Sequence, residues 1–94
     1  MSTANEALTT TWEKLAGNTD YFFVSVIGES PIEVAFQTTD VAPTTDPEII
    51  GHPMLPRDVI MRTADGSNCP PGFVYARVKD SSVASSVAYD VWSA

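Results

Sequence analysis

The chain lacks the residues on which several classes of protein depend. It has one cysteine, Cys69, so no intrachain disulfide can form, which excludes the small secreted folds that several disulfides hold together. Five basic residues against twelve acidic ones give a net charge of −7, which repels phosphate backbones and anionic lipid surfaces. The composition therefore predicts a protein with no nucleic-acid partner and no membrane partner.

Long apolar runs are also absent. The longest strongly apolar stretch, 21–27, is interrupted by Ser25 and is far shorter than the roughly 20 residues that a membrane-spanning helix needs. Residues 1–6 contain no basic residue ahead of an apolar core, so they do not resemble a signal peptide. We expect residues 1–94 to form a single soluble domain, because chains usually divide only beyond roughly 250 residues.

Short stretches in which apolar and polar residues alternate predict an all-β fold, and residue types that favour strands dominate those stretches. The predicted strands are 8–15, 21–27, 32–38, 57–63, 73–79 and 87–92. Residues 8–15 also fit a helix, because Leu8, Trp12 and Leu15 fall on one helical face, and the strand interpretation rests on consecutive threonines. Residues 21–27 are too continuously apolar for an exposed edge and predict a central strand.

The connections between these strands have the composition of turns and loops. The prolines of residues 40–56 are Pro43, Pro47, Pro53 and Pro56. Because proline cannot donate a hydrogen bond to a central strand, residues 40–56 are predicted to form a long surface loop. About six short antiparallel strands, with turns roughly every 8 to 12 residues, predict a β-sandwich or a small barrel. Residues 1–7 are predicted to form a flexible arm or to add a strand to a neighbouring subunit.

Side chains that could carry catalysis or bind a metal are few and scattered. His52 is the only histidine, and its spacing from Asp46 and Glu48 matches no specific metal site. Cys69 has no predicted helix N-terminus or histidine nearby that would activate its thiol. The glycines fall singly at turns, and no Gly-x-Ser-x-Gly motif occurs. We therefore predict a non-enzymatic protein with no catalytic residue, no cofactor and no metal site.

Aromatic residues are the remaining candidates for a binding role. In so small a β-domain most of the four Phe, three Tyr and two Trp residues must fill the core. Trp12 and Trp92 lie near the termini, where an exposed ring more often marks a subunit contact than a ligand site. Core packing is the alternative for both. Aromatic content and the proline-rich loop also leave a carbohydrate-binding module open as a second, less favoured function.

Three short motifs carry a family resemblance. They are SPIEVAF at 30–36, GHPMLP at 51–56 and GFVYAR at 72–77, the last being a glycine-led strand that follows a Gly-His loop. In this order, between Trp12 and Val91, they resemble small structural proteins encoded in bacteriophage head and tail gene clusters. The resemblance implies a compact β-sandwich without catalytic residues, located on the surface of the phage particle and made in the cytoplasm of the bacterial host.

Within this resemblance the favoured role is a capsid decoration, or cement, protein. Such a protein binds the major capsid protein and copies of itself, and we expect a homotrimer that stabilises the assembled head. A tail or receptor-binding accessory module is the alternative role. His52 and Leu55, in the Gly-His loop, join Trp12 and Trp92 as predicted interaction residues.

Overall fold

The computed structural model describes residues 4–43, 52–79, 82 and 84–93, and within them it contains nine strands and no helix. The strands are β1 Ala4–Leu8, β2 Glu13–Ala16, β3 Tyr21–Val26, β4 Ile32–Gln37, β5 His52–Met54, β6 Val59–Thr63, β7 Gly66–Ser67, β8 Phe73–Arg77 and β9 Ser85–Trp92. All pairings are antiparallel. The prediction of an all-β fold is confirmed.

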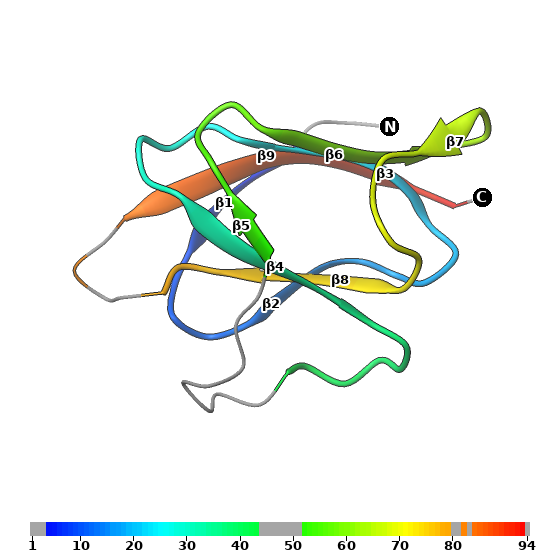
Figure 1. Ribbon diagram of the computed structural model, residues 1–94, viewed down its shortest axis with the longest axis horizontal. Helices are drawn as coiled ribbons and strands as arrows, with labels where there is room; N and C mark the ends of the chain where they lie inside the picture. The colour runs from blue at the N-terminus through cyan, green and yellow to red at the C-terminus, as the bar shows by residue number, and fades with distance from the viewer. Residues whose placement is uncertain (1–3, 44–51, 80–81, 83, 94) are drawn as a thin grey trace.

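The strands form two sheets that lie one above the other (Figure 1). The large sheet has the strand order β1-β9-β3-β6-β7, and the small sheet has the order β2-β8-β4-β5. The sheets do not close into a barrel, so of the two predicted architectures the two-layer one is correct. β3 lies between β9 and β6, which confirms the central strand predicted from its apolar sequence.

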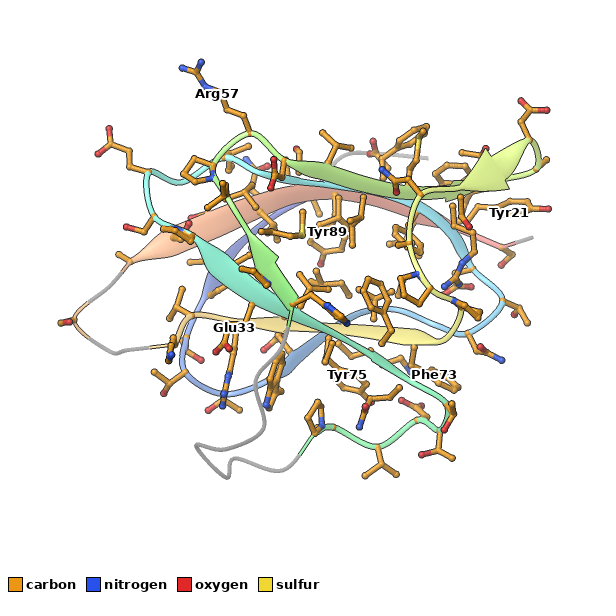
Figure 2. The ribbon with its side chains drawn as sticks, in the orientation of Figure 1. Tyr21, Glu33, Arg57, Phe73, Tyr75 and Tyr89 are labelled. Carbon is orange, nitrogen blue, oxygen red and sulfur yellow. The ribbon has the colours of Figure 1, made fainter. Side chains whose placement is uncertain are left out.

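Alternating side chains from the two sheets meet between the layers and form the core. Phe22 and Val24 of β3 are fully buried there, and Tyr89 of β9 also points between the sheets (Figure 2). The small sheet contributes Ile32 and Val34 from β4, which alternate with residues on the other face of the strand. Burying each such side chain stabilises the fold by roughly 1.5–3 kcal/mol.

Residues 8–15 do not form one strand, which corrects the prediction. β1 ends at Leu8 in the large sheet and β2 begins at Glu13 in the small sheet, so the chain crosses between the layers. The threonines at 9–11, on which the strand prediction rested, lie in this crossing and not in a strand. The crossing is held by a backbone hydrogen bond from Val78 N to Thr9 O, at 2.9 Å.

The predicted arm at 1–7 is replaced over residues 4–7 by strand β1, and residues 1–3 lie outside the described residues. β1 pairs with β9 in a regular register in which Glu6 lies opposite the fully buried Val87. The pairing is possible because β9 is long enough to contact β1 on one side and β3 on the other.

The structure has nine strands where six were predicted. The division of 8–15 into β1 and β2 adds one, and two short strands add the others. β5, which contains Pro53, lies in the segment predicted as the loop 40–56, and it is an edge strand, where proline is tolerated. Of that loop, residues 44–51 lie outside the described residues. β7 forms a tight hairpin with β6 in a segment predicted as a turn.

Arg62 of β6 ties together the end of the sandwich. Its guanidinium donates hydrogen bonds to the carbonyl oxygens of Gly17, Asn18, Asp20 and Gly72 at 3.2, 2.9, 3.2 and 2.9 Å. Gly72 has a φ of 132°, and a Cβ there would lie 2.6 Å from the carbonyl oxygen of Gln37. The start of β8 therefore requires glycine, and the charge of Arg62 is used inside the fold.

Candidate functional site

The outer face of the large sheet carries exposed apolar side chains. Because Phe22 and Val24 point inward, Phe23 of β3 points outward, and the register places Met61 of β6 beside it. Phe23 and Met61 are 39% and 38% exposed. The prediction that β3 is central was right, but the apolar run does not mean burial on both faces, since no layer among the described residues covers this side.

The apolar surface continues to both ends of β3. At one end the ring of Trp92 lies 5.6 Å from that of Phe23 and 6.0 Å from that of Tyr21. At the other end Val59 and Ile27 are 46% and 53% exposed. The surface therefore runs the length of the strand.

We call this surface the apolar stripe. Its residues are Ile27, Val59, Met61, Phe23 and Trp92. It includes all the large, exposed hydrophobic side chains of the described residues except Val41 and Leu55. Contiguous exposed apolar surface on a small protein, rich in aromatic residues and Met, is typical of an interaction site.

Charge is nearly absent from the same face. The outward-facing residues of its four longer strands are Asn5, Ala7, Tyr21, Phe23, Ser25, Val59, Met61, Thr63, Ser86, Ala88, Asp90 and Trp92. Asp90 is the one charged residue among them. A chain with a net charge of −7 therefore has one sheet face that can meet another protein with little repulsion.

A strained turn lies at the Ile27 end of the apolar stripe. Asp58 N donates to Leu55 O at 3.0 Å, and Arg57 has a φ of 75°, so with Pro56 in the second position the turn is type II. The turn is fixed to β3 by the hydrogen bond from Arg57 N to Val26 O, at 3.0 Å. Glycine usually occupies the position of Arg57, and a side chain there costs roughly 1–2 kcal/mol.

The Arg57 side chain projects away from the sandwich (Figure 2). Among the described residues it is the only non-glycine residue with a positive φ. An open hollow of about 750 Å³ lies between this turn and the end of β3, with Ser25, Ile27 and Glu29 on its wall. Arg57 is not among the residues predicted from the sequence, although a Pro-Arg-Asp segment without glycine is a readable signal of this turn.

The outer face of the small sheet is covered by the chain itself. Arg77 Nε donates to Glu33 Oε1 at 3.1 Å, and the two side chains are 10% and 9% exposed. The guanidinium lies 4.4 Å from the ring centre of Trp12, which is 6% exposed. Trp12 thus covers an ion pair. Its burial agrees with packing inside the protein, which was the alternative to a subunit contact for this residue.

A second polar group on this face holds the segment after β4. Tyr75 Oη donates to Asp40 at 2.8 Å, and Lys14 Nζ donates to the other carboxylate oxygen at 2.8 Å. The bond from Lys14, followed by that from Tyr75, holds the pKa of Asp40 below its ordinary value. Figure 2 shows Tyr75 and Glu33 on the side of the small sheet that faces away from the large sheet.

Tyr75 is expected to ionise above the ordinary phenol pKa of 10.0, because burial disfavours the phenolate and the bond to Asp40 disfavours it further. Since the folded-state pKa exceeds the unfolded one, this contribution to stability is complete below pH 10.0 and is lost as the pH rises through the folded-state pKa.

Asp40→Asn should lower the pKa of Tyr75 only partly, since burial remains. A spectrophotometric phenolate titration, with Tyr75→Phe subtracted, measures it, and an unchanged pKa in Asp40→Asn would contradict this account.

The four predicted interaction residues do not come together. Trp92 lies at one end of the apolar stripe and Leu55 lies in the turn before β6, whereas Trp12 is buried on the outer face of the small sheet. His52 is exposed on β5, at the edge of the small sheet, with its ring 5.9 Å from that of Phe36. Their role as interaction residues stays a prediction.

Cys69 and the acidic side chains are the other chemically active groups of the described residues. Burial raises the pKa of the Cys69 thiol, and Arg62 opposes that shift only in part, so the thiol is protonated at neutral pH. In the part of the chain that the structure describes, no three His, Cys, Asp or Glu side chains gather where they could hold a metal ion.

The chain was also compared with known proteins. Neither a scan of protein-family models nor searches of curated proteins and of solved structures gives a match. A search of the described residues for a helix long and apolar enough to span a membrane likewise found none. The function is therefore inferred from the surface of the chain and from the sequence resemblance.

Proposed function

We propose that the chain is a non-enzymatic structural protein of a bacteriophage particle, and specifically a capsid decoration protein that stabilises the assembled head. The apolar stripe is the observation that carries the proposal, because it gives an acidic chain a nearly uncharged surface for docking to other proteins. The motifs SPIEVAF, GHPMLP and GFVYAR direct the proposal to phage structural proteins. The partners are the major capsid protein and further copies of this chain, which acts as a homo-oligomer.

The size of the stripe fits a protein that works in many copies. Strands about 4.8 Å apart and roughly six residues long give the large sheet an outer face of about 400 Å² in projection. A stable interface buries roughly 800 Å² on each partner, so a single contact through this face is weak. Repeating it around the symmetry axes of a capsid multiplies the binding, since linked contacts have a high effective concentration.

Val59→Glu is expected to reduce the number of copies bound to the head by about tenfold or more, because a carboxylate would be buried in an apolar contact. Val41→Glu is the matched control, since Val41 is also an exposed valine, at 63% against 46% for Val59, and lies outside the stripe. Heads that lack the chain are incubated with each variant, and bound copies are counted by mass spectrometry against the major capsid protein. Equal loss in both variants would contradict a role for the stripe.

The copy number in native particles tests the proposal as a whole. Copies in a simple ratio to the major capsid protein would support head decoration. A few copies per particle would instead favour the tail or receptor-binding accessory role, and absence from purified particles would reject a virion function.

A carbohydrate-binding module is the second candidate, favoured by the aromatic group at Trp92. The planes of the Phe23 and Tyr21 rings are tilted from that of Trp92 by 32° and 57°, so the three rings do not form a flat platform for a sugar. This geometry favours a protein partner. A sugar that shifts tryptophan fluorescence in the wild type, and not in Trp92→Ala, would reverse this preference.

A further inference from the structure

Most of the basic residues are used inside the fold. Lys14, Arg62 and Arg77 bind Asp40, backbone carbonyl oxygens and Glu33, respectively. Arg57 and Lys79 are the other two of the five, and both are exposed. Neither side chain makes a hydrogen bond or ion pair with another described residue. Two cations are therefore available to a partner, and Arg57 is the one at the apolar stripe.

The position of Arg57 is favourable for contact with a partner. It lies two residues before Val59, which is an exposed part of the stripe, and its backbone is hydrogen-bonded to the end of β3. Its backbone conformation suits glycine, yet the position carries a long charged side chain that projects outward. Strained residues of this kind concentrate at binding sites.

Asp90 provides a matching anion on the same face. It lies on β9 opposite Phe23, nearer the Trp92 end of the stripe, whereas Arg57 lies at the Ile27 end. No hydrogen bond or ion pair joins the Asp90 side chain to another described residue. One cation, at the turn, and one anion, on β9, are thus separated along a face whose four longer strands carry no other outward-facing charge.

We propose that this face binds a second copy of the chain, stripe against stripe, with Arg57 of each copy paired to Asp90 of the other. The two-fold axis lies in the plane of the contact and runs across the strands, so it reverses their direction. The Ile27 end of one stripe therefore covers the Trp92 end of the other. Two identical ion pairs form, as an isologous contact requires. Two copies of net charge −7 repel one another over the rest of their surfaces, and this face is where the repulsion is smallest.

The inference rests on the proposed function and deepens it: the contact through the stripe is the one between copies of the chain on the head, so Val59→Glu removes copies by breaking this contact, and the contact is two-fold, not three-fold. From an area of about 400 Å² per copy, a dissociation constant in the micromolar range or weaker is expected. The test uses the purified chain with no phage particle. A failure of self-association and a failure of head binding are therefore separate results, and either can occur without the other.

The test is a charge exchange, followed by sedimentation over a range of protein concentrations. Arg57→Asp and Asp90→Arg should each weaken dimerisation by about tenfold, and the double variant should restore it to near the wild-type value. Lys79→Asp is the matched control, with the same charge change outside the stripe, and should dimerise like the wild type. Thermal unfolding confirms that each variant is folded.

Three results would overturn the proposal. The wild type could remain monomeric at all concentrations and bind only capsid shells. Arg57→Asp could behave like Lys79→Asp, or the double variant could bind no better than the single ones. Rising salt concentration should also weaken the wild-type dimer more than the double-neutral variant Arg57→Asn/Asp90→Asn.

Discussion

Glu33→Ala is expected to lower the free energy of unfolding by about 3–5 kcal/mol, which is a large part of the roughly 5–15 kcal/mol typical of a whole domain. The carboxylate lies 3.1 Å from the Arg77 guanidinium, and both side chains are about nine-tenths buried. Removing the carboxylate leaves a cation under the Trp12 ring in surroundings where water cannot replace the lost charge. Urea denaturation followed by tryptophan fluorescence measures the change.

Two further variants show whether charge burial is the cause. The double variant Glu33→Leu/Arg77→Met removes both charges and should recover much of the lost stability, because a buried ion pair adds little over well-packed apolar side chains. Lys14→Ala breaks the exposed ion pair with Asp40 and should change stability very little. A loss below about 1 kcal/mol in Glu33→Ala would show that the pair is not a major part of the fold.

Arg62→Ala is expected to cost about 3 kcal/mol, because four carbonyl oxygens lose a charged hydrogen-bond donor at once. Its contact with the Phe22 ring, at 4.9 Å, is lost as well. Arg62→Lys should be intermediate, since an ammonium group cannot reach the Gly17 turn and Gly72 at the same time. Lys79→Ala is the control for removal of a cation from the surface.

Hydrogen exchange separates this account from a general loss of stability. In Arg62→Ala the amides of residues 17–20 and 72 should exchange faster than expected from global unfolding alone, because these segments lose their attachment to β6. Uniform acceleration across β3 and β9 would instead indicate that Arg62 contributes only to overall stability.

The sequence was most informative where alternation was long enough to read. β4 has six residues, and its alternation identifies Ile32 and Val34 as the inward side, whereas the continuously apolar β3 predicts only a central position. β5 and β7 have three and two residues, too few to show any period, and both were missed. Residues 8–15 were joined into one strand because the threonines at 9–11 favour a strand, and residue preference cannot show that the chain there crosses from one sheet to the other.

The site was harder to predict because it depends on strand order. Phe23, Met61 and Trp92 come together through pairings of β3 with β6 and β9, which are distant in sequence. Trp12 was predicted as a possible contact from its place near the N-terminus, and the sequence could not show the Glu33–Arg77 pair that it covers, because those residues lie 44 positions apart. The one available signal was that a central strand apolar on both sides, in a fold of two layers, must leave one apolar side exposed.

Strand β1 bears on how the protein resists fibre growth. Of the four outer strands, β5 contains proline, β7 has two residues and β2 has a shift in register, and each feature hinders the addition of another strand. β1 is regular over five residues and has a single charge, at Glu6, on the side that faces the core. Protection against runaway sheet extension at that margin therefore depends on one carboxylate.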